Sequence, residues 1–72
     1  MPPGTGKVKI ETRLKDAEVF VDGAFAGTVR ETKDMYLKSG AHNLEIRAAG
    51  HPKYSERLYV LGGKTLKVSP GF

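Results

Sequence analysis

The sequence predicts an all-β domain, specifically a small antiparallel β-sandwich of six or seven short strands. Apolar and polar residues alternate with a period of two wherever the chain is regular, which is typical of half-buried strands. No segment carries apolar residues at the spacing of an amphipathic helix. Glycine, aspartate and proline divide the alternating runs into short pieces, as turns between strands do. A small barrel fits the same pattern, because alternation alone does not separate a closed sheet from two stacked sheets.

The 72 residues allow one small domain. A chain of this size buries only about 60% of its unfolded surface, so little material remains for a deep cleft. We expect the domain over residues 6–69, a linker or cloning remnant over 1–5, and a tail over 70–72, the whole being part of a longer multidomain protein. No apolar run approaches the roughly 18 residues of a membrane-spanning helix. The absence of cysteine leaves the redox compartment open.

The first strand is expected over residues 7–15, with apolar residues and Thr12 on its inner side and charged residues outside. The second, over 17–22, places Val19 inward and Phe20 outward. Asp22-Gly23 then predicts a tight turn, because Gly accepts a positive φ and Asp bonds the backbone just ahead. The remaining strands are expected over 24–29, 35–37, 43–49, 54–61 and 66–68.

Glycines predict where these strands bend or end. Gly27 indicates a bulged strand at a sheet edge, and Gly40 ends the short strand before it. The segments 17–22 and 44–48 have the apolar inner faces of central strands, so a polar residue at Val19 or Ile46 should unfold the domain.

An ordered set of short motifs resembles the PEGA domain family over nearly the whole chain. The most specific are residues 17–23 (AEVFVDG), Gly27-Thr28 and the later Gly40-x-His42. The family's Pro-Glu-Gly-Ala signature is reduced here to its Ala, at Ala17. The resemblance implies a non-catalytic β-sandwich used as an appended or repeated module, mostly in extracytoplasmic or cell-envelope proteins.

The sequence indicates no catalytic site, cofactor or metal. Ser and His are present, but no Ser lies in a nucleophile elbow. No EF-hand or H-x-x-x-H spacing occurs. We expect His42 to be a turn residue whose ring bonds nearby backbone, and the Asp22 carboxylate to accept from backbone N–H groups.

Two sets of side chains could bind a partner. Aromatic rings expected to point away from the core would form a platform for a sugar or a protein side chain if they converge: Phe20, Phe25, Tyr36 and Tyr59. A basic face would bind a polyanion, either nucleic acid or an acidic glycan, if the first and last strands are neighbours: Lys7, Lys9, Arg13, Lys15 and Lys67. The net charge of +4 tolerates such a partner without demanding one. The alternative reading of both sets is structural, with rings that cover the sandwich and lysines that prevent edge-to-edge aggregation.

We therefore expect a module that binds a protein or a cell-envelope component such as a carbohydrate, or that spaces larger parts of a surface or secreted protein. Polyanion binding is the alternative function. Nucleic acid is the less favoured polyanion, because aromatic residues do not interleave with the basic ones.

Overall fold

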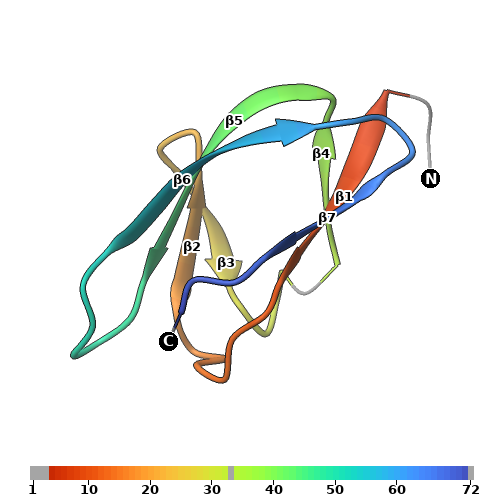
Figure 1. The fold of residues 1–72 in the computed structure, drawn as a ribbon. Helices are drawn as coiled ribbons and strands as arrows, with labels where there is room; N and C mark the ends of the chain where they lie inside the picture. The colour runs from red at the N-terminus through yellow and green to blue at the C-terminus, as the bar shows by residue number, and fades with distance from the viewer. Residues whose placement is uncertain (1–3, 33, 72) are drawn as a thin grey trace.

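Seven strands form two stacked sheets in the computed structural model, which describes residues 4–32 and 34–71 (Figure 1). Residues 1–3 of the expected linker and residue 72 of the expected tail lie outside this description. The strands are β1 (Thr5–Ile10), β2 (Glu18–Val21), β3 (Ala24–Thr28), β4 (Met35–Lys38), β5 (Gly40–Arg47), β6 (Tyr54–Val60) and β7 (Thr65–Val68). The predicted β-sandwich is confirmed.

The larger sheet has the strand order β3-β2-β5-β6, and all its neighbours are antiparallel. The central positions of β2 and β5 confirm the prediction made from their apolar inner faces, since Val19, Leu44 and Ile46 are almost fully buried. The predicted edge strand is also confirmed, because β3 pairs only with β2 within the described residues. A register shift between Val19 and Phe20 shows that β3 carries the expected bulge.

The smaller sheet has the order β4-β1-β7 and corrects two predictions. First, β1 and β7 are neighbours as supposed, but they run parallel, so the sandwich is not purely antiparallel. Second, β1 ends at Ile10 rather than continuing to residue 15. The backbone turns over residues 13–17, where the Ala17 N–H donates to the Leu14 carbonyl, and Arg13 and Lys15 therefore do not extend the outer face of β1.

The core lies between the two sheets and draws on strands of both. Its buried members are Val8, Ile10, Ala17, Val19, Val29, Leu44, Ile46, Leu58, Val60 and Val68. Gly6 allows the sheets to approach each other at one end: a Cβ built there would lie 2.5 Å from Val60 Cγ1 and 2.6 Å from the Leu61 carbonyl oxygen. Only a residue without a side chain fits between β1 and the end of β6.

The Asp22-Gly23 turn forms as predicted and joins β2 to β3. Both residues have positive φ, 52° and 83°, the combination that a two-residue hairpin turn of type I′ requires. The Asp22 carboxylate accepts a hydrogen bond from a backbone N–H, as expected, but the donor is Asn43 on β5, at 2.9 Å, rather than the backbone just ahead of the aspartate. In the described part of the chain, no helix is long and apolar enough to cross a membrane.

Candidate binding face on the four-stranded sheet

Two of the four predicted aromatic residues meet on the outer face of the four-stranded sheet. The two-residue Asp22-Gly23 turn pairs Val21 with Ala24 and Phe20 with Phe25, and the bulge follows at Ala26, so that Val19 lies opposite Gly27. Residues paired across antiparallel strands share a face, so both rings lie outside. Their centroids are 5.5 Å apart with planes inclined by 58°, and Phe25 is 58% exposed. The result is an exposed aromatic pair.

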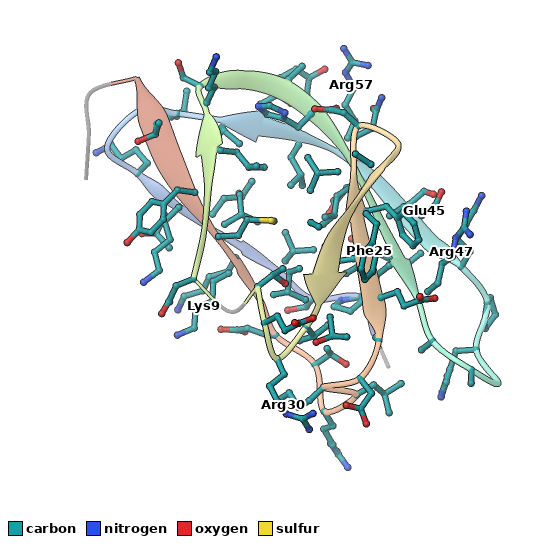
Figure 2. All side chains as sticks on the ribbon, turned by 180° about the vertical axis from the view of Figure 1, so that it is seen from behind. Lys9, Phe25, Arg30, Glu45, Arg47 and Arg57 are labelled. Atoms are coloured by element: carbon teal, nitrogen blue, oxygen red, sulfur yellow. The ribbon has the colours of Figure 1, made fainter. Side chains whose placement is uncertain are left out.

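Arg47 of β5 braces this pair. Its guanidinium carbon lies 4.6 Å from the centroid of the Phe20 ring, a cation–π arrangement. Glu45 accepts from the Arg47 Nε at 2.5 Å, and Lys53 Nζ lies 3.5 Å from the other oxygen of the same carboxylate. Figure 2 shows Phe25, Glu45 and Arg47 close together over this sheet. We call Phe20, Phe25, Glu45 and Arg47 the braced aromatic patch; sequence parity could not indicate its two charged members.

The other two predicted aromatic residues, Tyr59 and Tyr36, do not contact this pair. Tyr59 of β6 is 67% exposed on the same outer face, beside Arg57, whose guanidinium carbon is 5.9 Å from the tyrosine ring. Tyr36 belongs to β4 and pairs with Lys7 on the outer face of the other sheet. The structure therefore brings Phe20 and Phe25 together, with Tyr59 on the same face, and places Tyr36 on the opposite side of the molecule.

The five predicted basic residues do not form one surface. Lys9 and Lys67 are adjacent on the outside of the three-stranded sheet, and Figure 2 shows Lys9 away from Phe25. Lys7 on the same sheet forms an ion pair with Asp34, with 3.0 Å between Nζ and Oδ1, and this contact raises the lysine pKa. Arg13 and Lys15 follow the end of β1 and line an open depression of about 480 Å³ shared with Arg30. Arg30 in turn donates to Asp16 at 2.7 Å.

His42 connects a turn of one sheet to a strand end of the other. Its Nδ1 lies 2.7 Å from Asp22 Oδ2, and its Nε2 lies 2.7 Å from the carbonyl oxygen of Lys38 at the end of β4. The expectation that this ring bonds nearby backbone is confirmed, but His42 lies within β5 rather than in a turn, and its bond to Asp22 was not foreseen. The pKa of His42 is raised, mainly by its hydrogen bond to Asp22 and secondly by the one to the Lys38 carbonyl. The pKa of Asp22 is lowered, mainly by the hydrogen bond from the Asn43 N–H and secondly by the one from His42.

No group of three or more His, Cys, Asp or Glu side chains that could hold a metal ion occurs among residues 4–32 and 34–71. The fold and its outer face define a small β-sandwich domain that presents a braced aromatic patch on one sheet. The family model for the PEGA domain matches residues 5–71, nearly the whole chain. The chain belongs to the PEGA domain family, which confirms the resemblance seen in the sequence. Comparison with curated proteins and with solved structures gave no match.

Proposed function

We propose that this domain is a non-catalytic interaction module that docks a protein or cell-envelope component on the outer face of its four-stranded sheet. The observation that carries the proposal is the braced aromatic patch: Phe20 and Phe25 are in contact, and Phe25 remains largely exposed. Exposed aromatic rings held in place lose little side-chain entropy on binding, and they dominate the energetics of many interfaces.

The parallel pairing of β1 and β7 supports an additional spacing role. Because the two strands run in the same direction, the chain enters β1 at one end of the sandwich and leaves β7 at the other (Figure 1). The Cα atoms extend over 38 Å along the longest axis and 18 to 19 Å across it. A domain inserted between two neighbours through these ends would hold them apart along its length.

The hydrogen bonds of His42 support the non-catalytic part of the proposal. Both ring nitrogens are engaged, one by Asp22 and one by the Lys38 carbonyl. A general base needs a nitrogen with an available lone pair within reach of the proton it removes. Membership of the PEGA family supports an extracytoplasmic or cell-envelope setting for the parent protein.

A retention experiment tests the proposal. The wild-type domain and the variants Phe25→Ser and Tyr36→Ser are immobilised and exposed to a solubilised cell-envelope preparation of the parent organism. Both substitutions remove an exposed aromatic ring, but from opposite faces. We expect the wild type and Tyr36→Ser to retain a common component that Phe25→Ser loses. Equal retention by all three proteins, or none by any, would overturn the proposal.

Polyanion binding receives less support as a function. Its specific observation is the adjacent pair Lys9 and Lys67 on the three-stranded sheet. Affinity for heparin should fall steeply as salt is added and should be reduced by Lys67→Gln, because phosphate-like and sulfate-like contacts release counterions. Failure to bind heparin at low salt would eliminate this function.

A further inference from the structure

An open depression of about 280 Å³ lies beside the braced aromatic patch on the outer face of the four-stranded sheet. Residues of β2, β5, β6 and the β2–β3 turn line it: Phe20, Gly23, Asn43, Leu44, Glu45, Ser55, Glu56 and Arg57. Pockets for drug-sized molecules begin at about 300 Å³, so this depression has room for one ring-sized group.

Phe20 forms one wall of the depression. In the β2–β5 register Phe20 lies opposite Glu45, whereas Arg47 lies opposite Glu18, two residues farther along the sheet in one direction. Asn43 and Arg57, which pair with each other across β5 and β6, lie in the other direction. Arg47 stacks on the Phe20 ring but does not line the depression. The ring therefore stands between Arg47 and the depression and offers its other side to a ligand.

Two lining carboxylates are already engaged, Glu45 by Arg47 and Lys53 and Glu56 by Tyr54, but three other lining side chains carry hydrogen-bonding capacity that the described chain does not use. In the described ranges 4–32 and 34–71, the side-chain amide of Asn43 and the hydroxyl of Ser55 make no hydrogen bond. The Arg57 guanidinium lies 5.9 Å from the centroid of the Tyr59 ring and acts on Asp22 through its charge. Figure 2 shows Arg57 at the upper end of this face. An amide, a hydroxyl and a guanidinium together supply several donors and two kinds of acceptor.

This combination matches the chemistry of a sugar. The apolar C–H face of a pyranose stacks on an aromatic ring, and its hydroxyl groups each donate and accept hydrogen bonds. A protein partner would instead need a larger apolar area than one side of Phe20 provides here. We propose that the depression binds one pyranose ring of a glycan, with Phe20 as the stacking wall and Asn43, Ser55 and Arg57 as the hydroxyl-binding groups. The inference rests on the proposed interaction function and specifies its ligand class.

The Phe20 ring, which forms the stacking wall, is held in position without a ligand. Glu45 holds the Arg47 guanidinium, and Arg47 in turn packs on Phe20. Preorganisation reduces the entropy that binding costs, which matters for a shallow site with few contacts. A site this open should bind a single sugar ring weakly, with a Kd in about the millimolar range.

Titration of the isotope-labelled domain with cellohexaose, chitohexaose and a galacturonate hexamer, followed by amide NMR spectra, tests the inference. We expect at least one oligosaccharide to cause saturable shifts in residues 20–23, 43–45 and 55–57. Asn43→Ala should weaken that binding by about tenfold, the effect of losing one or two hydrogen bonds. Phe20→Leu should abolish it, because leucine keeps the apolar bulk but has no ring face. Tyr36→Ala, on the opposite sheet, should bind as the wild type does.

The three oligosaccharides also identify the sugar. Binding of the galacturonate alone, lost in Arg57→Gln, would assign an acidic sugar, and binding of a neutral oligosaccharide would assign a neutral one. The absence of saturable shifts with all three, shifts confined to the three-stranded sheet, or an unaffected Asn43→Ala variant would overturn the inference. If the glycan inference fails in this way, the interaction function would still be supported by a retention experiment in which the Phe25→Ser variant no longer retains an envelope protein that the wild type retains. The partner would then be a protein.

Discussion

The imidazole of His42 and the carboxylate of Asp22 form a hydrogen-bonded pair with 2.7 Å between Nδ1 and Oδ2. The other ring nitrogen contacts the Lys38 carbonyl oxygen at the same distance. An ionised carboxylate and a carbonyl can only accept hydrogen bonds, so both ring nitrogens must donate and the imidazole must carry both protons. The pair therefore links the β2–β3 turn to the end of β4 through a positively charged histidine, and it depends on pH.

Stability should decline above neutral pH because of this pair. The pKa of His42 is raised above its ordinary value of 6.5 in the folded protein, so its contribution is fully present below pH 6.5 and is lost as the pH rises through the raised pKa. The pKa of Asp22 is lowered from 3.8, so its contribution is present above pH 3.8 and is lost as the pH falls through the lowered pKa. We therefore expect the melting temperature to be highest between pH 3.8 and pH 6.5, where both contributions are present. Melting curves from pH 3 to pH 9 measure this.

The variant His42→Gln provides the control for the alkaline side. Glutamine is neutral at every pH, so the difference in melting temperature between wild type and variant should shrink as the pH rises above 6.5. A difference that stays constant over that range would show that the ring is not protonated in the folded protein. His51 is present in both proteins and cancels in the comparison.

Gly6→Ala should destabilise the domain by about 1–3 kcal/mol, the usual cost of forcing an extra methyl group into a packed interior. The new Cβ would overlap Val60 Cγ1 and the backbone oxygen of Leu61, and the backbone oxygen cannot rotate away. Gly62→Ala is the matched control, because the nearest atom to its Cβ would be 3.5 Å away and its φ is not in the left-handed region. Urea denaturation measures both; equal stability of the two variants would contradict the close approach of the sheets.

Thr28→Val should cost about 1 kcal/mol, the typical value for removing a capping hydroxyl. Thr28 and Glu31 bond reciprocally: the Glu31 carboxylate accepts from the Thr28 N–H at 2.9 Å and from its hydroxyl at 3.1 Å, and the Glu31 N–H donates to that hydroxyl at 3.4 Å. This is the arrangement of a capping box around the turn after β3. Chemical denaturation of the wild type and Thr28→Val measures the loss; an unchanged midpoint would show that the turn does not need the hydroxyl.

Tyr54 should ionise well above the ordinary pH for a tyrosine side chain. Its hydroxyl donates to Glu56 Oε2 at 2.6 Å, and this hydrogen bond, followed by burial, raises its pKa to about 12. The phenolate absorbance of the folded domain should therefore include a rise near pH 12 that is absent from Tyr54→Phe. If the absorbance that Tyr54→Phe loses is one that rises near pH 10, the ordinary value for tyrosine, the contact would be contradicted.

Phe20→Ala and Tyr59→Ala should differ in their effect on stability. Tyr59 is 67% exposed, so its loss should change the free energy of unfolding by less than about 0.5 kcal/mol. Phe20 is half-buried between Phe25 and Arg47, and losing the aromatic contact alone should cost about 1 kcal/mol. Thermal unfolding measures both; equal melting temperatures would show that the braced aromatic patch contributes nothing to the fold.

Much of this fold could be predicted because the alternation of buried and exposed residues is visible within short segments of the sequence. Val19 and Ile46 occupy the apolar positions of an alternating pattern, and each is buried on a central strand. The Asp22-Gly23 turn follows from the same kind of local rule, since its backbone angles suit those two residues. The membership of the family, from short ordered motifs, was readable in the same way.

The end of β1 and its parallel partner were not predictable from local pattern. Thr12 and Leu14 continue the alternation of Val8 and Ile10, but the chain must leave the three-stranded sheet to enter the other one, so the strand stops at Ile10. The direction of β7 relative to β1 depends on the path of the whole chain between them, which no hairpin signal encodes.

The sequence by itself determined most of the strands, the core and the hairpin turn, because a residue's hydrophobicity and backbone preference act within a few positions along the chain. The tertiary structure decided which side chains meet. The two-residue turn already pairs Phe20 with Phe25, but Arg47 reaches Phe20 only across the pairing of β2 with β5. Such contacts arise between strands, where register rather than composition sets the distance between two side chains.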